Sequence, residues 1–280
     1  MIASDIMTSP VFVVSMTETV AHARKLMIKH KISRLPVMDG SVMTGIITKK
    51  DIGYRLRQTE PLWKRRPVDL VPVSILMTAD PCYAGPDTPV RDLAGLMVGS
   101  CISGIPILDG GSIAGIVTKS DLLKSSLAGN LKETVSDMME DAVQISRYHS
   151  LDHVIDTMCE RNDKLVVVNN DGTLAGIIGE SNLAFFRYPE GRSNGVPEKE
   201  ITMLRKDESA GRKHYRDVVS LSAIAEDVMS RPVLTIASDA PVKEAVEQMR
   251  RGHVSSLVVV DGNEIKGILK RDDIIQDVAK

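Results

Sequence analysis

The stretch GIITKKD at residues 45–51 decides the fold, because it recurs as GIVTKSD at 115–121, GIIGESN at 176–182 and GILKRDD at 267–273. A methionine lies at the same distance before each glycine, and another lies twenty positions before that one. The two sets are Met27, Met97, Met158 and Met249, and Met7, Met77, Met138 and Met229. Recurrence at fixed offsets indicates an internal repeat. We therefore predict four units that align without gaps.

The first unit has the apolar pattern of a β-α-β-β-α course. The expected elements are a strand at 11–14, a helix at 19–30 capped by Thr17 or Thr19, strands at 35–38 and 43–48 joined by an Asp39-Gly40 turn, and a helix from Lys49. A sheet this small, covered on one side, leaves apolar surface that a second unit must bury. The units should therefore fold in pairs.

Composition excludes several classes of function. The 280 residues carry 35 Lys plus Arg against 37 Asp plus Glu, so no positive excess attracts nucleic acid or anionic lipid. Aromatic residues are only 3%, which leaves few stacking platforms for single-stranded nucleic acid. The sequence has no phosphate-binding Gly-x-x-x-x-Gly-Lys-Ser/Thr loop, no Gly-x-Gly-x-x-Gly and no His-Glu-x-x-His motif. We predict that the protein is not an enzyme.

Cysteine usage and the N-terminus predict the compartment. Cys82, Cys101 and Cys159 are odd in number and widely spaced, which suits reduced thiols buried in a core. The first residues do not resemble a signal peptide, and the aliphatic runs are too short to cross a bilayer. We expect a cytoplasmic protein that does not insert into membranes.

The end of the second strand in each unit carries the chemistry. Thr48 and Thr118 each precede an acid by three positions, Asp51 and Asp121. One interpretation is a capping box that only starts the following helix. In the other, the helix N-terminus and the threonine hydroxyl hold a phosphate, while the acid one turn inward accepts hydrogen bonds from the two hydroxyls of a ribose. The second interpretation describes a nucleotide site.

The fourfold motif resembles the closing motif of the CBS (cystathionine beta-synthase) domain family, glycine-aliphatic-x-Thr/Ser-x-x-Asp after a β-α-β-β-α course. The resemblance covers all four units and implies a mixed α/β fold. It also implies two tandem pairs, called Bateman modules, which form a disc and bind AMP, ADP, ATP or S-adenosylmethionine between units. The layout is similar to that of the gamma subunit of AMP-activated protein kinase and of archaeal stand-alone four-domain proteins. We place the units at 1–57, 72–127, 132–188 and 223–280, with a polar linker at 189–222.

Carried over position by position, the resemblance implies that Thr48, Thr118 and Arg34 contact phosphate and that Asp51 and Asp121 contact ribose. Unit 2 has Gly104 where unit 1 has Arg34. The resemblance also suggests residues that line an adenine slot, although such residues are commonly part of the core. These are Val11, Pro36, Ile46, Pro106 and Ile116.

Units 3 and 4 depart from the pattern. Gly179 and Asn182 replace the threonine and the acid in unit 3, so we expect no tight nucleotide binding there. Unit 4 keeps Asp273 as a ribose acceptor but has Lys270 in place of the threonine. Lysine either binds a phosphate as a point charge or is a solvated surface residue.

The leading hypothesis is a non-catalytic sensor that binds an adenosine-containing small molecule and alters a separate partner protein. An alternative is nucleic-acid binding through the basic stretches 64–66 and 205–216. His149 and His153 have helical i, i+4 spacing, but we interpret them as a solvated edge and predict no metal site. The sequence leaves both a monomer and a homodimer open.

Overall fold

The structure is a computed structural model that describes residues 1–55, 68–126, 134–161, 164–186, 200–203, 213–216 and 223–278. Unit 1 has the predicted course, preceded by a short helix. Its elements are α1 (Ala3–Ile6), β1 (Val14–Ser15), α2 (Val20–Lys29), β2 (Arg34–Asp39), β3 (Val42–Thr48) and α3 (Lys49–Tyr54). Thr19 caps α2 by accepting a hydrogen bond from the His22 amide. The strand predicted at 11–14 is limited to Val14 and Ser15, because the chain before it is directed to unit 2.

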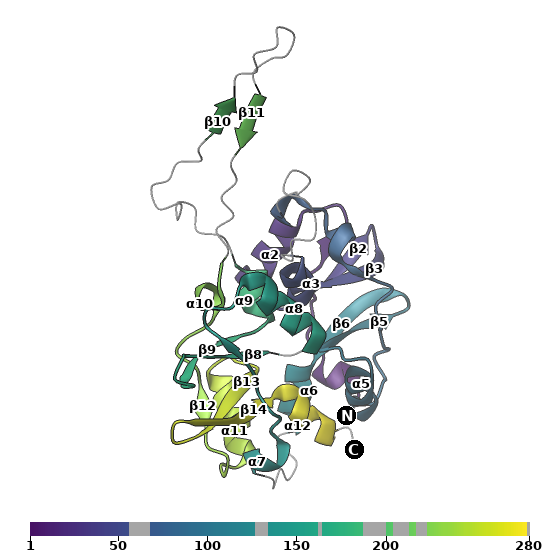
Figure 1. Cartoon of the computed structure of the whole chain (residues 1–280). Helices are drawn as coiled ribbons and strands as arrows, with labels where there is room; N and C mark the ends of the chain where they lie inside the picture. The colour runs from purple at the N-terminus through teal and green to yellow at the C-terminus, as the bar shows by residue number, and fades with distance from the viewer. Residues whose placement is uncertain are drawn as a thin grey trace.

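The other units repeat this order. Unit 2 has η2 (Val68–Leu70), α4 (Val73–Leu76), β4 (Thr78–Ala79), α5 (Val90–Gly99), β5 (Gly104–Asp109), β6 (Ser112–Thr118) and α6 (Lys119–Ser126). Unit 3 has α7 (Val135–Met138), β7 (Val143–Ser146), α8 (Leu151–Arg161), β8 (Leu165–Val168), β9 (Leu174–Ile178) and α9 (Glu180–Ala184). Unit 4 has α10 (Ala225–Val228), β12 (Thr235–Ile236), α11 (Val242–Arg251), β13 (Ser256–Asp261), β14 (Glu264–Lys270) and α12 (Arg271–Val278). Between units 3 and 4, β10 (Glu200–Met203) pairs antiparallel with β11 (Lys213–Arg216), away from the body of the molecule (Figure 1).

The first residues of each unit pair with a strand of the other unit in its pair. The residues directly after the first short helix, which we call the crossing segment, pair with the last strand of the neighbouring unit. The pairs are Thr8 with Ile116, Thr78 with Ile46, Glu140 with Ile268 and Ser230 with Ile177. Units 1 and 2 thus exchange segments, as do units 3 and 4, which confirms the predicted pairing.

The exchange explains the four motif glycines. A Cβ built on Gly45 would lie 2.7 Å from Sδ of Met77, and Cβ atoms on Gly115 and Gly176 would collide in the same way with Met7 and Met229. On Gly267, the Cβ would lie 2.5 Å from the Glu140 carbonyl oxygen. The crossing segment therefore lies directly on the strand, and glycine is the residue that leaves room for it.

One detail of the predicted alignment is wrong. Met7, Met77 and Met229 each follow the first short helix of a unit, but Met138 is the last residue of α7 and Met139 follows it. Unit 3 is therefore one residue shorter between this methionine and its long helix. With this shift, Glu140 corresponds to Thr8 and Thr78.

The two pairs meet through the helices that follow the motif. In Figure 1, α3 of unit 1 lies beside α9 of unit 3, and α6 of unit 2 lies beside α12 of unit 4. A Cβ on Gly53 would lie 2.8 Å from Cβ of Leu183, so glycine permits the close approach of α3 and α9. Units 2 and 4 share one apolar core, which includes Met97 and Ile274. The four units together form the expected disc.

The expectation that the three cysteines are buried is wrong, because Cys82, Cys101 and Cys159 are all exposed. None of the helices in the described part of the chain has the length and apolar character needed to cross a bilayer.

Candidate functional site

The motif residues of units 1 and 2 form the capping box. Asp51 Oδ2 accepts hydrogen bonds from the Thr48 amide at 2.7 Å and from the Thr48 hydroxyl at 2.6 Å. In unit 2, Asp121 Oδ2 accepts from Thr118 at 3.0 and 2.6 Å. The second oxygen remains: Asp51 Oδ1 accepts no hydrogen bond from a described residue, and Asp121 Oδ1 has only the exposed Lys124 ammonium at 3.5 Å. The box thus holds each carboxylate in place and leaves one oxygen able to accept further hydrogen bonds.

Unit 3 has no such spare oxygen. Asn182 Oδ1 accepts from the Gly179 amide at 3.0 Å, and its Nδ2 donates to the Val228 carbonyl at 2.7 Å and to Ser230 Oγ at 2.9 Å. The amide therefore ties the crossing segment to the strand end. This arrangement supports the expectation that unit 3 binds no nucleotide tightly.

Unit 4 keeps the acid in a different setting. Asp273 Oδ2 accepts from the Lys270 amide at 2.7 Å, whereas its Oδ1 is buried and has no hydrogen-bond partner among the described residues. The Lys270 ammonium, predicted to meet phosphate, donates to Glu140 Oε2 at 2.6 Å. Burial raises the pKa of Asp273 to about 7, and the carboxylates of Glu140 and Asp272 act in the same direction.

The predicted adenine-slot residues gather where the two units of the first pair meet. Pro36 lies opposite Ile46 across β2 and β3, Pro106 lies opposite Ile116 across β5 and β6, and β3 contacts β6. All four are buried, so they also serve the core. Val11 follows the crossing segment that pairs with Ile116, which places it on the chain that approaches the unit 2 motif rather than the unit 1 motif.

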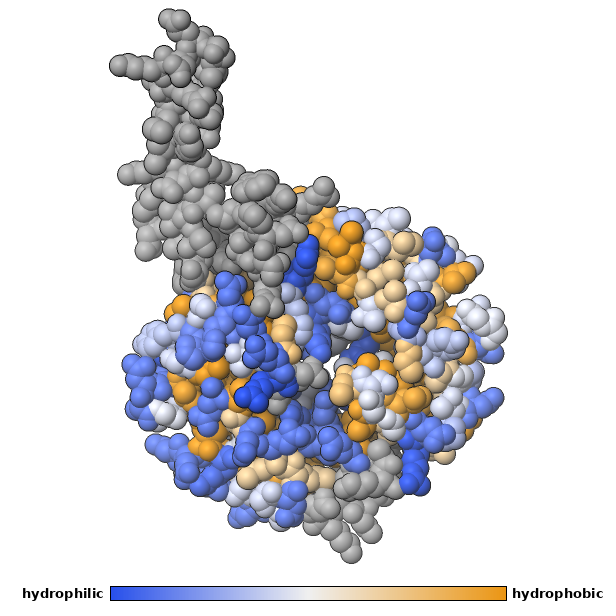
Figure 2. Space-filling view, turned by 45° about the vertical axis from the view of Figure 1, so that its right-hand side comes forward, coloured by the Kyte–Doolittle hydropathy of each residue, from blue (hydrophilic) through white to orange (hydrophobic). Residues whose placement is uncertain are grey.

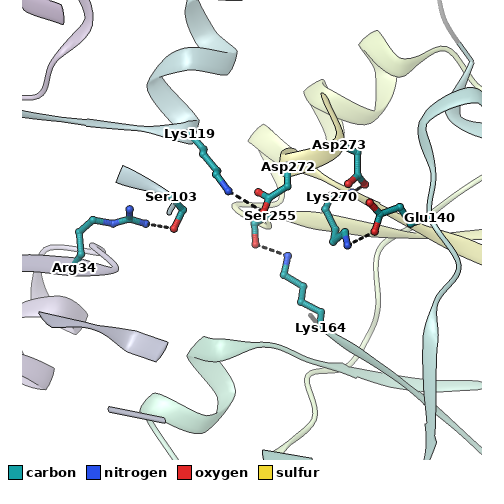
Figure 3. Close-up of polar contacts among 9 residues, drawn as sticks. All are labelled: Arg34, Ser103, Lys119, Glu140, Lys164, Ser255, Lys270, Asp272 and Asp273. Carbon is teal, nitrogen blue, oxygen red and sulfur yellow. Dashed lines mark hydrogen bonds and ion pairs between the residues drawn. The ribbon is translucent and has the colours of Figure 1, made fainter. Parts of the chain in front are cut away.

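Basic side chains from different units surround the centre of the disc. Arg34 donates to Ser103 Oγ at 2.8 Å, Lys164 to Ser255 Oγ at 2.7 Å, and Lys119 pairs with Asp272 at 2.8 Å. Figure 3 shows these side chains, drawn from all four units, directed toward one region, and Figure 2 shows polar side chains around a hollow in the middle of the visible face. Gly104 leaves room for Arg34 in this position, because a Cβ on it would collide with the Arg34 guanidinium.

This region favours anions. Burial lowers the pKa of Arg34 from its ordinary value, while the charges of Glu180, Asp121 and Asp272 oppose that shift. Burial also lowers the pKa of Lys49, which donates to Ser181 Oγ at 3.1 Å. A cation that has lost hydration and is bonded to a neutral serine hydroxyl binds an anion more favourably than a fully solvated cation does. In unit 1, burial raises the pKa of Asp51, and the Thr48 hydrogen bonds oppose the shift.

A cavity of about 570 Å³ lies elsewhere in unit 4, lined by residues that include Thr235, Pro241, Glu244 and Val260. Lys270 pairs with Ser256 at one end of β13, whereas Val260 lies near the other end. The cavity is therefore separate from the motif. His149 is exposed and its ring meets that of His153 edge to face at 4.4 Å. Among the residues that the structure describes, no three His, Cys, Asp or Glu side chains are grouped to hold a metal ion.

Six residues at this centre were not predicted: Ser103, Lys119, Glu140, Lys164, Ser255 and Asp272. Three of them, Ser103, Lys164 and Ser255, correspond to Ser33 of unit 1, so a comparison of the position before Arg34 in all units indicates these three. Glu140 was hidden by the one-residue shift in unit 3, because a gapless alignment places Met139 opposite Thr8. The basic stretch 64–66 and residues 205–212 lie outside the described residues.

A model of the CBS domain matches residues 3–56, 73–128, 134–187 and 225–280. Protein MJ1225 from Methanocaldococcus jannaschii, proposed to be an archaeal homologue of g-AMPK, is 22% identical over 93% of this chain and 92% of its own. Its crystal structure superposes with a TM-score of 0.81 over 99% of this chain and all of that one. At this identity the likeness shows the fold.

Two further relatives match by sequence. The CBS domain-containing protein YhcV from Bacillus subtilis is 31% identical over 44% of this chain and 84% of its own length. An A-adding tRNA nucleotidyltransferase from Geobacter sulfurreducens is 28% identical over 52% of this chain, but the match spans only 16% of that enzyme. The chain therefore belongs to the CBS domain family and consists of four CBS domains in two pairs, the architecture of a regulatory module.

Proposed function

We propose that this protein is a non-catalytic sensor that binds adenosine-containing nucleotides at the motifs of units 1 and 2. The observation that carries the proposal is the second carboxylate oxygen of Asp51 and of Asp121. Among the described residues, this oxygen accepts no hydrogen bond in Asp51 and contacts the exposed Lys124 ammonium at 3.5 Å in Asp121, while a threonine at the start of a helix fixes each carboxylate. A fixed carboxylate oxygen with two lone pairs accepts hydrogen bonds from the vicinal hydroxyls of a ribose. The acid thus selects a nucleoside rather than a free phosphate.

The neighbouring groups supply the contacts that the rest of a nucleotide needs. The N-termini of α3 and α6 and the ammonium group of Lys49 suit a phosphate, whereas the Lys119 ammonium is already paired with Asp272. Ile46 and Ile116 remain 8% and 9% exposed, whereas the next residues, Ile47 and Val117, are fully buried. These two isoleucines therefore keep an apolar edge on which a base can pack.

The Thr48 and Thr118 hydroxyls are not free to donate a hydrogen bond to phosphate. Each donates its proton to the acid in this structure, so it holds the carboxylate rather than offers a free donor. Direct donation to phosphate requires the hydroxyl to rotate away from the acid. We infer that their first task is to orient the ribose acceptor.

The site also suggests how a signal passes to a partner. Each motif strand is paired with a crossing segment of the other unit, and each motif helix packs on the opposite pair. A ligand bound between these elements changes how the units of the disc pack if it binds one packing arrangement more tightly than another, and the difference in affinity sets the size of the shift. The partner that reads this change is a separate protein in the cytoplasm.

Calorimetry tests the proposal. AMP, ADP, ATP and S-adenosylmethionine are titrated into the full chain and into the Asp51→Ala and Asp121→Ala variants. We expect about two equivalents of AMP, ADP or ATP on the wild type and one fewer on each variant. Each variant loses its capping box, so its thermal unfolding midpoint should fall by a few degrees while the chain stays folded. Absence of binding of all four compounds to the folded wild type would refute the proposal.

A further inference from the structure

Unit 4 differs from units 1 and 2 at two positions that face each other. The crossing segment carries Thr8 beside the unit 2 motif and Thr78 beside the unit 1 motif, but Glu140 beside the unit 4 motif. The motif itself has Lys270 in place of the threonine. Two hydroxyl residues are thus exchanged together for a carboxylate and an ammonium.

The exchanged residues form an ion pair at the strand end. Lys270 Nζ lies 2.6 Å from Glu140 Oε2, and the lysine side chain is only 15% exposed (Figure 3). The pair lies directly beside the start of α12, at the place that the unit 1 and unit 2 motifs offer to an anion. Glu140 already supplies the negative charge there.

Unit 4 nevertheless retains Asp273, the acid at the position expected to contact the ribose. Asp273 is 7% exposed, and its Oδ1 is buried without a partner among the described residues. It also lacks the hydroxyl donor that Asp51 and Asp121 receive from their threonines. A buried carboxylate oxygen without a donor destabilises the folded chain, and ligand hydroxyls at this oxygen would remove that cost.

Charge then decides which ligand fits. A phosphate at this strand end would face the carboxylates of Glu140 and Asp272, whose countercharges on Lys270 and Lys119 are already engaged in ion pairs. Arg271 of the same helix is bonded to Ser120 Oγ at 2.6 Å and to the Val254 carbonyl at 2.7 Å. Because both lysines are already paired with carboxylates, a phosphate must compete with the carboxylates for them and is repelled by the same carboxylates. A neutral or positively charged substituent escapes this repulsion and meets the Glu140 carboxylate.

We propose that unit 4 binds a nucleoside whose 5′ substituent is uncharged or positively charged, such as a sulfonium, and that the Lys270–Glu140 pair excludes 5′-phosphates from it. The adenosine part of this ligand rests on the proposed function. The charge preference rests on the ion pair and on the buried oxygen of Asp273. The protein would then bind two chemically different nucleosides, an anionic one in the pair formed by units 1 and 2 and a non-anionic one in the pair formed by units 3 and 4.

The test uses the full chain with units 1 and 2 silenced by Asp51→Ala and Asp121→Ala. Adenosine, S-adenosylmethionine and AMP are the probes, and binding is measured by equilibrium dialysis. We expect about one equivalent of S-adenosylmethionine or adenosine and affinity for AMP at least about tenfold weaker. Adding Glu140→Thr and Lys270→Thr should reverse the order. The matched control is Glu264→Thr with Lys266→Thr, which removes an exposed ion pair of 2.7 Å on the same strand and should leave the order unchanged.

The outcomes separate the two proposals. If the wild type binds nucleotides but the silenced chain binds none of the three probes, or binds AMP as tightly as S-adenosylmethionine, the unit 4 inference fails and the proposed function stands. If the wild type binds none of them, the proposed function fails. Should the fourfold variant not fold, Asp273→Asn in the silenced chain replaces it. This variant keeps the shape, and it must lose the remaining binding for the inference to hold.

Discussion

Replacing Asp273 with asparagine should stabilise the protein at neutral and alkaline pH. Asp273 is buried, and its pKa in the folded chain is raised from an ordinary value of 3.8 to about 7. The folded state therefore holds a proton that the unfolded state has already lost between about pH 4 and pH 7. Stability falls with rising pH through this window, by up to about 1.4 kcal/mol per pH unit, and the penalty is complete above pH 7.

The expected gain in stability follows from the size of the pKa shift of Asp273. A rise of roughly three pKa units corresponds to a ceiling of about 4 kcal/mol. Local relaxation and water entry reduce such penalties, so we expect a gain of about 2 kcal/mol for Asp273→Asn near pH 8. Asn182 shows how the amide fits at this position, because its Nδ2 donates to the carbonyl of Val228, the last residue of α10. The corresponding carbonyl in unit 4 belongs to Met138.

Guanidinium denaturation followed by circular dichroism, at about pH 5 and pH 8, measures the effect. The gain should be larger at pH 8, because the wild-type carboxylate is ionised there and protonated at pH 5. Asp137→Asn is a control of opposite sign, since hydrogen bonds from Thr134 lower the pKa of that exposed carboxyl, and the variant should be less stable than wild type at both pH values. An equal gain at both pH values for Asp273→Asn, or a loss at pH 8, would refute the reasoning.

Two further predictions concern packing and the capping box. Gly53→Ala places a Cβ 2.8 Å from Leu183 Cβ, so it should lower the free energy of unfolding by about 1–3 kcal/mol. The control Gly95→Ala lies in a helix with open space around it and should raise the free energy of unfolding by about 0.5–1 kcal/mol. Equal effects of the two variants in denaturation would contradict the α3–α9 contact. Thr118→Val removes the hydroxyl that donates to Asp121, so it should cost about 1 kcal/mol and weaken AMP binding at unit 2 about tenfold in calorimetry. Thr134→Val removes the same contact in the box of α7, 2.7 Å from Asp137, and should cost similar stability without changing AMP affinity. Loss of AMP affinity in both variants would show that the effect is not local to the motif.

Much of the fold was predictable from sequence because each unit obeys local rules. The short apolar run within residues 43–48, the spacing of Val20, Ala23 and Met27, and the threonine caps all act within a few residues. Fourfold repetition made the pattern unambiguous. The capping boxes of units 1 and 2 formed for the same reason.

Contacts between units were not predictable in this way. The crossing segments depend on where Met7 and its counterparts meet a glycine of the other unit, and in units 1 and 2 that glycine is more than thirty residues away in the sequence. The one-residue shortening of unit 3 hid Glu140 from comparison with Thr8. The Lys270–Glu140 pair joins residues that are distant in sequence, so Lys270 alone could not show that its charge was already neutralised.

The exposure of the cysteines was a second failure of local reasoning. Cys101 has a positive φ of 52° at the end of its helix, which turns this position outward. The position corresponds to Lys31 of unit 1, which also has a positive φ and is exposed. Comparison across units would have predicted a surface site where residue type alone favoured a buried one.

The hydroxyl specificity of ligand binding tests the central claim most directly. AMP and 2′,3′-dideoxy-AMP are titrated into the wild-type chain by calorimetry under identical conditions. If Asp51 and Asp121 hold the ribose through both hydroxyls, the dideoxy compound should bind about a hundredfold or more weakly, because two hydrogen bonds to a charged group are lost. Equal affinity for the two compounds would contradict the assignment of these carboxylates.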